Sequence, residues 1–292
     1  MEPGTYRRSL KSPAGEEFFD LLFFRPAAYL FVLLISRTPI TPNQVTGLSL
    51  AAGLAAAWGL SWGNRAGMTW GAVLYALANV LDCADGQLAR LKNTGTLLGR
   101  VVDGAADYIS GVFITFGLGL GFANSGSPMW GLVVLAGISS AIHATFFDFY
   151  QGEFLARSAG KPNFIDREAG RFSAEIERMQ SNPRTKLKRW LLRFYLSYLR
   201  IQKILGQALE ASGSRTTANG SDSAAMIRIW SFLGPTTNRT ILIICALFGR
   251  IDYYLWIVVG AGNAWLAFAY ILEARARRRN MSGGRPAAEG TR

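Results

Sequence analysis

Four aspartates lie close together in a chain that is otherwise rich in apolar residues. Two residues separate Asp82 from Asp85, and three separate Asp103 from Asp107. Because a helix turns about 100° per residue, each pair shares a face, with its members about 60° and about 40° apart. Carboxylates that face one another in an apolar setting cannot all stay ionised without a cation. Hard oxygen ligands select Mg²⁺, Mn²⁺ or Ca²⁺, so the spacing predicts a divalent-metal site.

The residues beside the aspartates indicate what such ions would help to bind. Gly86, Ala89 and Gly99 share the helical faces of the acids, and residues this small let a ligand approach the backbone closely. Arg90 lies at the edge of the first face, where it could pair with a phosphate. Two divalent ions about 4 Å apart would stabilise both sides of an in-line displacement at phosphorus. This pattern favours chemistry on a diphosphate.

Other interpretations of the acids stay open at this point. They could pair with Arg90, Lys92 and Arg100 at a helix end, although that would explain neither the small residues nor the repeated spacing. A cation or proton transporter would also place acids within a membrane. A transporter predicts ion flux across vesicles, whereas a transferase predicts turnover of a nucleotide-activated donor.

The composition places these acids in a membrane protein. Half of the 292 residues are hydrophobic, and the mean hydropathy is +0.19. The net charge of +12 would suit either nucleic acid or an anionic membrane surface. Because the basic residues lie beside apolar runs, we expect membrane lipids as partners and no nucleic acid.

We expect an all-α integral membrane protein with six transmembrane helices, an N-terminal interfacial amphipathic helix and a helical cytoplasmic insertion. The connection LKNTGT is short, so the second and third spans should be antiparallel neighbours. The expected spans are about Asn43–Trp62, Met68–Leu91, Leu98–Phe122, Pro128–Tyr150, Thr236–Phe248 and Ile251–Leu272.

The distribution of basic residues predicts the orientation of these spans. With six spans, the basic N-terminus, the loop of the motif, the 151–228 segment and the basic tail share one side, which the positive-inside rule makes the cytoplasm. A further apolar run, Leu21–Ile35, contains Arg25. If it crossed the membrane, the basic N-terminus would lie on the side opposite the cytoplasm. We therefore expect Phe18–Ser36 to lie at the interface. The expected location is a bacterial inner membrane, with the active site facing the cytoplasm.

The segment between the fourth and fifth spans differs in character. The stretch KLKRWLLRFYLSYLRIQKIL interleaves basic residues with aromatics and leucines, which is typical of an amphipathic helix on an anionic surface. The polar stretch Ala211–Ala224 predicts a flexible linker. The expected organisation is an N-terminal cytoplasmic or interfacial segment (1–42), four spans with the motif (43–150), a basic cytoplasmic insertion (151–228), two spans (229–273) and a basic disordered tail (274–292).

The motif resembles that of a known family. DCADGQLAR, then eight residues, then GRVVDGAAD match D-x2-D-G-x2-A-R-x8-G-x3-D-x3-D at every fixed position. This is the signature of the CDP-alcohol phosphotransferase (CDP-alcohol phosphatidyltransferase) family of integral-membrane phospholipid synthases. The resemblance is specific over Asp82–Asp107 and looser over the six-span core, and it does not account for 151–228.

The resemblance implies roles for individual residues. Asp82, Asp85 and Asp103 would ligate two divalent ions, Mg²⁺ or Mn²⁺, while Asp107 would contribute to the metal site and act as the general base. Without the family, Asn43 and Thr46 would be read as a helix cap after Thr-Pro. The residues implied for the CDP donor are Asn43, Thr46, Asp82, Gly86, Arg90 and Thr96.

The resemblance also implies the reaction but leaves the substrates open. An acceptor hydroxyl would attack the phosphorus of a CDP-activated donor, and CMP would leave. We favour CDP-diacylglycerol as the donor and a small polar alcohol such as inositol, inositol phosphate or glycerol phosphate as the acceptor. The alternative is transfer of a phosphocholine- or phosphoethanolamine-type group to a lipid alcohol. Arg239 is the candidate for an acceptor phosphate, with headgroup snorkelling as its other reading. The small residues of Gly117–Phe122 leave a homodimer open.

Overall fold

The chain folds into helices joined by short turns. No strand occurs among the residues that the computed structural model describes, so the all-α prediction is confirmed. Those residues are 6, 8–10, 15–160, 164–179, 185–211 and 220–283.

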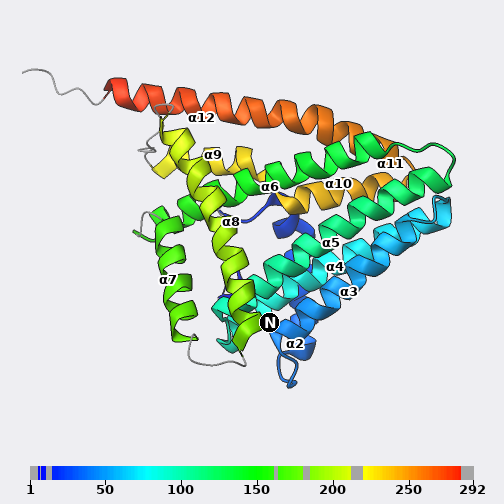
Figure 1. Cartoon of the computed structure of the whole chain (residues 1–292), viewed down its shortest axis with the longest axis horizontal. Helices are drawn as coiled ribbons and strands as arrows, with labels where there is room; N and C mark the ends of the chain where they lie inside the picture. Colours follow the sequence, from blue (N-terminus) through cyan, green and yellow to red (C-terminus); the bar gives the residue numbers. More distant parts are fainter. Residues whose placement is uncertain are drawn as a thin grey trace, which may run out of the picture.

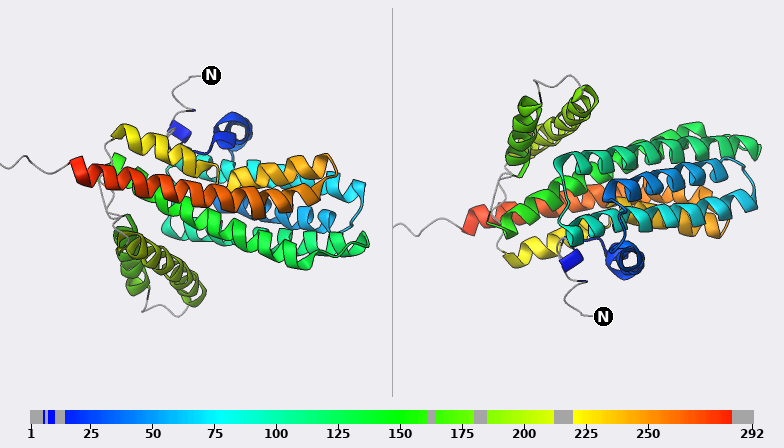
Figure 2. Two further views of the ribbon diagram at one scale, coloured as in Figure 1. Left: turned by 90° about the horizontal axis from the view of Figure 1, so that it is seen from above. Right: turned by 90° about the horizontal axis from the view of Figure 1, so that it is seen from below.

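A bundle of long helices forms the body of the molecule, with α2, α7 and α8 lying across it (Figures 1 and 2). A π-helical turn, η1 (Asp20–Phe24), leads into α2 (Arg25–Ile35), so the predicted N-terminal helix is present. Its position at a membrane interface stays a prediction. The helices of the bundle are α3 (Pro42–Leu60), α4 (Arg65–Lys92), α5 (Leu97–Asn124), α6 (Trp130–Ser158), α10 (Pro235–Leu247), and α11 (Ile251–Trp256), which continues through η3 (Ile257–Gly262) into α12 (Asn263–Gly283).

Local capping fixes where the motif helices begin and end. Thr41 and Gln44 form a capping box at the start of α3. Asn93 ends α4 in the left-handed conformation, with a φ of 53°. Three residues later, Thr96 accepts a hydrogen bond from the Gly99 backbone N–H at 2.9 Å and starts α5. This tight reversal keeps the acids of α4 and those of α5 at the same end of the bundle.

Helix α3 packs closely against both α4 and α5, whereas α4 and α5 make little contact with each other. The prediction that the two motif helices are direct neighbours was therefore wrong. Glycines allow this arrangement: a Cβ on Gly117 of α5 would lie 2.3 Å from the Ala57 carbonyl oxygen, and one on Gly121 would lie 2.3 Å from that of Leu60. Two glycines of the Gly117–Phe122 stretch, which could have served a homodimer contact, thus pack against α3 of the same chain.

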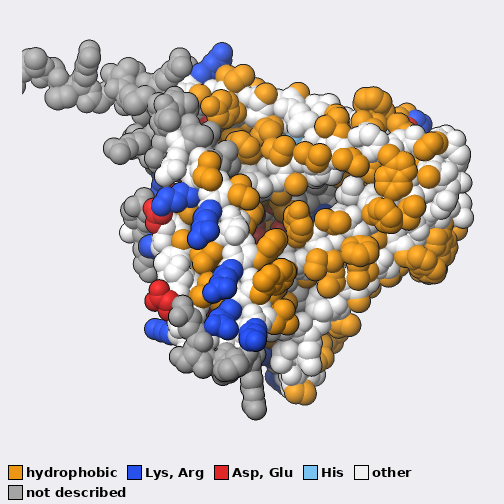
Figure 3. Space-filling view, in the orientation of Figure 1, with side chains coloured by type: hydrophobic (Ala, Val, Ile, Leu, Met, Phe, Trp, Pro, Cys, Tyr) orange, Lys and Arg blue, Asp and Glu red, His pale blue; other side chains and the backbone are white. Residues whose placement is uncertain are grey.

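Three helices among the described residues are long and apolar enough to cross a membrane: Leu97–Asn124, Trp130–Ser158 and Ile251–Arg275. They correspond to the third, fourth and sixth predicted spans, so the count of six is not confirmed. Helix α10 has 13 residues, which extend about 20 Å and fall short of a hydrocarbon core of about 30 Å. The outer face of the bundle shown in Figure 3 is largely hydrophobic, as expected for contact with lipid.

The segment after α6 forms three further helices: α7 (Phe164–Arg178), α8 (Lys186–Ala211) and α9 (Gly220–Ser231). Helix α9 covers the last five residues of the predicted linker, which are therefore helical, while 212–219 lie outside the described residues. Residues 274–283 are also helical, contrary to the predicted disordered tail. The remainder of that tail, 284–292, lies outside the described residues.

The packing of α3 against α5 predicts that Gly117→Ala lowers the melting temperature. The added Cβ would overlap the Ala57 backbone, and overpacking of this kind typically costs roughly 1–3 kcal/mol. Gly111→Ala is the matched control on the same helix, because its Cβ would meet nothing within 4 Å. Alanine favours a helix over glycine by about 1 kcal/mol, so this variant should be as stable as the wild type or more so. Thermal unfolding in detergent, followed by circular dichroism, measures both; equal melting temperatures for the two variants would contradict the packing.

Candidate active site

Three motif acids form a carboxylate cluster (Asp82, Asp85 and Asp103). One oxygen from each side chain lies within 4.8 Å of the oxygens of the other two, although Asp103 comes from a different helix. Asp85 is buried, whereas Asp82 and Asp103 are half-buried, which leaves the cluster partly open. Three oxygen donors at this separation fit a hard divalent cation such as Mg²⁺ or Mn²⁺, which fills its other positions with water or substrate oxygens.

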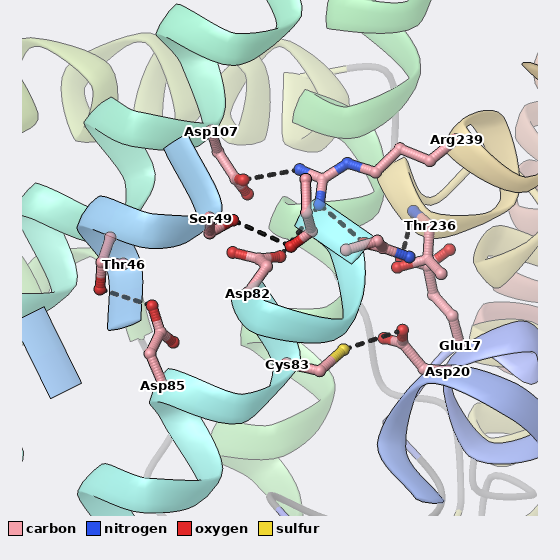
Figure 4. A network of polar contacts seen from close by, with 12 residues as sticks. Glu17, Asp20, Thr46, Ser49, Asp82, Cys83, Asp85, Asp107, Thr236 and Arg239 are labelled. Atoms are coloured by element: carbon pink, nitrogen blue, oxygen red, sulfur yellow. Dashed lines mark hydrogen bonds and ion pairs between the residues drawn. The ribbon is translucent and has the colours of Figure 1, made fainter. Parts of the chain in front are cut away.

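Asp107 lies outside the carboxylate cluster and pairs with Arg239 of α10. In Figure 4 the guanidinium of Arg239 reaches between the two motif helices. Its Nη2 lies 2.7 Å from Oδ1 of Asp107, and its Nη1 lies 3.0 Å from Oδ2 of Asp82 and 2.8 Å from Oδ1 of Asn79. The Arg239 side chain is 13% exposed and that of Asp107 is 39% exposed. Arg239 therefore compensates two motif carboxylates, a role that sequence reasoning did not assign to it.

Thr46 joins α3 to the carboxylate cluster. Its hydroxyl donates to Oδ2 of Asp85 at 2.5 Å, and it also lies 3.1 Å from the Pro42 carbonyl oxygen, one turn earlier. Both Thr46 and Asp85 are buried. In the structure the Thr46 hydroxyl orients a predicted metal ligand, and its predicted contact with the nucleotide end of the donor stays a prediction.

Two other predicted donor residues meet at the start of α5. A Cβ on Gly99 would lie 3.1 Å from the Thr96 hydroxyl oxygen and 3.4 Å from Oδ1 of Asn43, so both polar groups border this glycine. Asn43 and Thr96 are exposed. The structure thus brings together an amide, a hydroxyl and a small residue at the start of the helix that carries Asp103, in an arrangement that could accept a polar ligand.

Arg90 reaches the N-terminal segment. Its Nε donates to the Ser9 carbonyl oxygen, and its guanidinium lies beside Gly86, 3.4 Å from where a Cβ would be. Its Nη2 is buried and has no hydrogen-bond partner among the described residues. Arg90 is therefore held at one nitrogen and free to donate at another.

Residues 15–25 support the site from behind. Gln87 of α4 donates to the Arg25 carbonyl oxygen at 3.1 Å, and the Cys83 thiol donates to Oδ1 of Asp20 at 3.5 Å. Arg25 is itself fixed by Glu16, at 2.9 Å. Cys83 and Gln87, one helical turn apart on α4, thus dock this segment.

Glu17 holds the helix that carries Arg239. Its two carboxyl oxygens accept hydrogen bonds from the backbone N–H groups of Thr236 and Thr237, at 3.1 and 2.9 Å, at the start of α10 (Figure 4). The N-cap residue of α10 is Gly234, which has no side chain to cap the helix, and a Cβ there would lie 2.2 Å from the Glu17 carboxyl carbon. Sequence reasoning missed Glu17; the available signal was a helix start, Gly-Pro, without a cap of its own.

Burial raises the pKa of Glu17 to about 8, and the nearby carboxyl group of Asp20 adds to the increase. The hydrogen bonds from Thr237 and Thr236 act in the opposite direction, because they favour the ionised form. A group with this raised pKa binds its proton more firmly in the folded chain than in the unfolded chain. It links the stability of the N-terminal segment and α10 to pH.

Comparison with known proteins agrees with this site. Residues 39–165 match the family model described as CDP-alcohol phosphatidyltransferase. This part of the chain is a domain of the CDP-alcohol phosphatidyltransferase family, and the resemblance based on the motif is confirmed. The domain contains the carboxylate cluster and Asp107, whereas Glu17 and Arg239 lie outside it.

Two curated relatives match part of this chain. Both are named bifunctional IPC transferase and DIPP synthase. The protein from Thermococcus kodakarensis is 29% identical over 115 residues, which are 39% of this chain and 24% of the relative. The protein from Rubrobacter xylanophilus is 34% identical over 100 residues, which are 34% of this chain and 22% of the relative. The chain therefore matches under a quarter of the length of each relative.

Glu17→Gln should flatten the dependence of stability on pH. The stability contributed by the protonated Glu17 carboxyl is present in full below its ordinary pKa of 4.5 and is lost as the pH rises through about 8. The melting temperature of the wild type should therefore fall between about pH 4.5 and about pH 8, and that of Glu17→Gln should fall less over the same range. Glu177→Gln, an exposed position on α7, is the control and should follow the wild type. If all three proteins lose stability in parallel, Glu17 does not titrate as described.

Proposed function

We propose that the protein is a metal-dependent transferase of phospholipid biosynthesis. In this proposal a phosphatidyl group passes from CDP-diacylglycerol to a small polar alcohol, and CMP is released. The observation that carries it is the convergence of Asp82, Asp85 and Asp103 from two helices, within a domain of the CDP-alcohol phosphatidyltransferase family. The names of both relatives describe transferase and synthase activities, which agrees with a transfer reaction.

The carboxylate cluster would hold one divalent cation, Mg²⁺ or Mn²⁺. A second ion follows from the family resemblance and would need Asp107 as a ligand, shared with Arg239. When bound, the ions supply Lewis-acid stabilisation of the negative charge on the diphosphate. The buried hydrogen bond from Thr46 keeps Asp85 oriented for this role.

The CDP donor would bind along the end of the bundle that carries the motif. Asn43 and Thr96 offer hydrogen bonds to the nucleotide where they border Gly99. Gly86 leaves space beside Arg90, whose unpartnered Nη2 can donate to a phosphate oxygen. Arg90, held by the Ser9 carbonyl oxygen of the N-terminal segment, would then contact the substrate rather than the acids.

Asp107 is the proposed general base. Its carboxylate is 39% exposed, so an acceptor hydroxyl can reach it, and the Arg239 guanidinium, 2.7 Å away, holds it in place. As the hydroxyl oxygen attacks the phosphorus that carries the lipid, the bond from this phosphorus to the bridging oxygen breaks. CMP leaves with that oxygen, and the proton passes to Asp107.

Arg239 would orient Asp107 next to the reacting hydroxyl. Its donors are already committed to Asn79, Asp82 and Asp107, so a phosphorylated acceptor would have to share it. This argues for Arg239 as a positioning residue for the base, with contact to an acceptor phosphate as an added role.

The apolar helices support a membrane location, and we propose that the end of the bundle with the motif faces the cytoplasm. The motif loop, the α7–α8 pair and the end of α12 all lie towards this end (Figure 1). Because these segments are basic, the positive-inside rule places them in the cytoplasm. CDP-activated lipids made on the cytoplasmic leaflet could then enter the site from the bilayer.

Asp82→Ala and Asp103→Ala should each abolish CMP formation from CDP-diacylglycerol in the presence of Mg²⁺ or Mn²⁺. Each variant removes one of three clustered oxygen donors, and loss of a catalytic metal position should lower turnover by on the order of 10³-fold or more. Asp252→Asn, on α11 and paired with Arg250, is the control and should retain activity. Turnover retained in either alanine variant would refute the assignment.

The same purified protein identifies the acceptor. We expect a labelled small polar alcohol to enter the product lipid when CDP-diacylglycerol is the donor. Product formed only from CDP-choline or CDP-ethanolamine and a lipid alcohol would place the enzyme in the other donor branch. Metal-dependent ion flux into vesicles without any CMP release would instead support a transporter.

A further inference from the structure

Helix α8 presents one face to the protein and leaves another uncovered. Leu192, Leu199 and Gln202 are buried on the inner face, where the leucines pack with Phe172 of α7 and Val101 of α5. This pair of helices is fastened near the active site: Tyr198 of α8 donates to Oδ2 of Asp148 on α6 at 2.7 Å, and Glu168 of α7 pairs with Arg100 of α5 at 2.7 Å. The orientation of α8 about its own axis is therefore fixed by the fold.

The uncovered face of α8 carries an apolar stripe. At about 100° per residue, four large apolar side chains fall within an arc of about 60° on this face. All four are strongly exposed: Leu187 (70%), Trp190 (62%), Phe194 (51%) and Ile201 (58%).

A row of basic residues runs beside the apolar stripe. By the same angular count, Lys186, Arg193 and Arg200 lie within about 40° of one another, between the apolar stripe and the buried leucines on one side of the helix. All three are exposed. Within α8, six basic residues are accompanied by a single acid, Glu210. An exposed surface that combines large apolar side chains with unbalanced positive charge fits an anionic lipid surface.

The placement of α8 matches that of a helix at a bilayer surface. It lies across the lengthwise helices, as an interfacial helix must lie across transmembrane ones (Figure 1). Figure 3 shows a row of Lys and Arg side chains along this face, with hydrophobic side chains on the side towards the bundle. The apolar stripe therefore adjoins the hydrophobic outer face of the bundle, and the basic row lies on its outer side.

We propose that α8 is an interfacial helix that binds the headgroups of anionic lipids. The apolar stripe enters the boundary of the acyl chains, while Lys186, Arg193 and Arg200 contact phosphate groups at the membrane surface. The inner face meanwhile stays docked on α5 through Val101, two residues before Asp103. Binding of the bilayer by α8 would thus anchor a helix pair that borders the carboxylate cluster. This role is independent of which donor and acceptor the enzyme uses.

The test uses an environment-sensitive fluorophore (NBD) on Trp190→Cys in the full-length protein. Both native cysteines are buried, so labelling of the wild type under the same conditions reports any background. The labelled protein is reconstituted into nanodiscs of phosphatidylcholine, or of phosphatidylcholine with phosphatidylglycerol. Ser173→Cys, at an exposed polar position on α7, is the matched control.

With phosphatidylglycerol present, the label at 190 should shift to the blue and resist quenching by aqueous iodide. High salt, or Arg193→Gln combined with Arg200→Gln, should reverse much of this change. The label at 173 should stay in water throughout. These two arginines point away from the core, so unchanged melting temperatures verify that the double variant is folded.

Three results would overturn the proposal. A label at 190 that stays exposed to iodide in anionic nanodiscs excludes membrane binding by α8. Equal protection in both lipid mixtures excludes a role for anionic headgroups. Protection that appears in detergent and grows with protein concentration would show that a second copy of the chain covers this face instead.

Discussion

The structure depends on how it compensates negative charge that is concentrated inside an apolar bundle. Asp82, Asp85, Asp103 and Asp107 come from two helices that α3 holds apart, yet three of their carboxylates converge within 4.8 Å. Carboxylates this close repel one another strongly where water is scarce. Arg239 offsets the charge of Asp82 and of Asp107, and the Thr46 hydroxyl donates a hydrogen bond to Asp85. The negative charge that is left over is what the proposed dication would balance, so the proposed metal site and the structural charge balance involve the same residues.

This charge balance requires support from parts of the chain that are distant in sequence. Arg239 reaches the acids because α10 starts at a defined place, and that start is held by Glu17, some 220 positions earlier. The segment that contains Glu17 is in turn fixed to the back of α4 through Gln87 and Cys83. One side of the motif helix therefore faces the carboxylate cluster while the other anchors the N-terminal segment. Movement of that segment would change the positions of both Arg239 and Arg90, which border the proposed site.

The sequence was sufficient for features that depend on local periodicity. The spacing of Asp82, Asp85 and Asp103 predicted their meeting, and the reversal between Asn93 and Thr96 follows from residues that favour caps. Features that depend on packing between helices could not be predicted from the sequence. The position of α3 between α4 and α5 results from glycines that match backbone oxygens across the interface, which no periodicity within one helix reveals. Arg90 was expected beside the acids because it lies at the edge of their helical face, but in the structure its Nε donates to the Ser9 carbonyl oxygen.

The linkage between Arg239 and metal binding tests the central claim most directly. Isothermal titration of Mn²⁺ into the full-length protein in detergent should give a dissociation constant for the wild type. Asp103→Asn should weaken binding by about tenfold or more, because each unit of lost ligand charge is worth more than 1.4 kcal/mol at such short range. Arg239→Gln should tighten binding, because it removes the competing positive charge from Asp82. Unchanged affinity in Asp103→Asn, or weaker binding in Arg239→Gln, would show that the carboxylates are not compensated in this way.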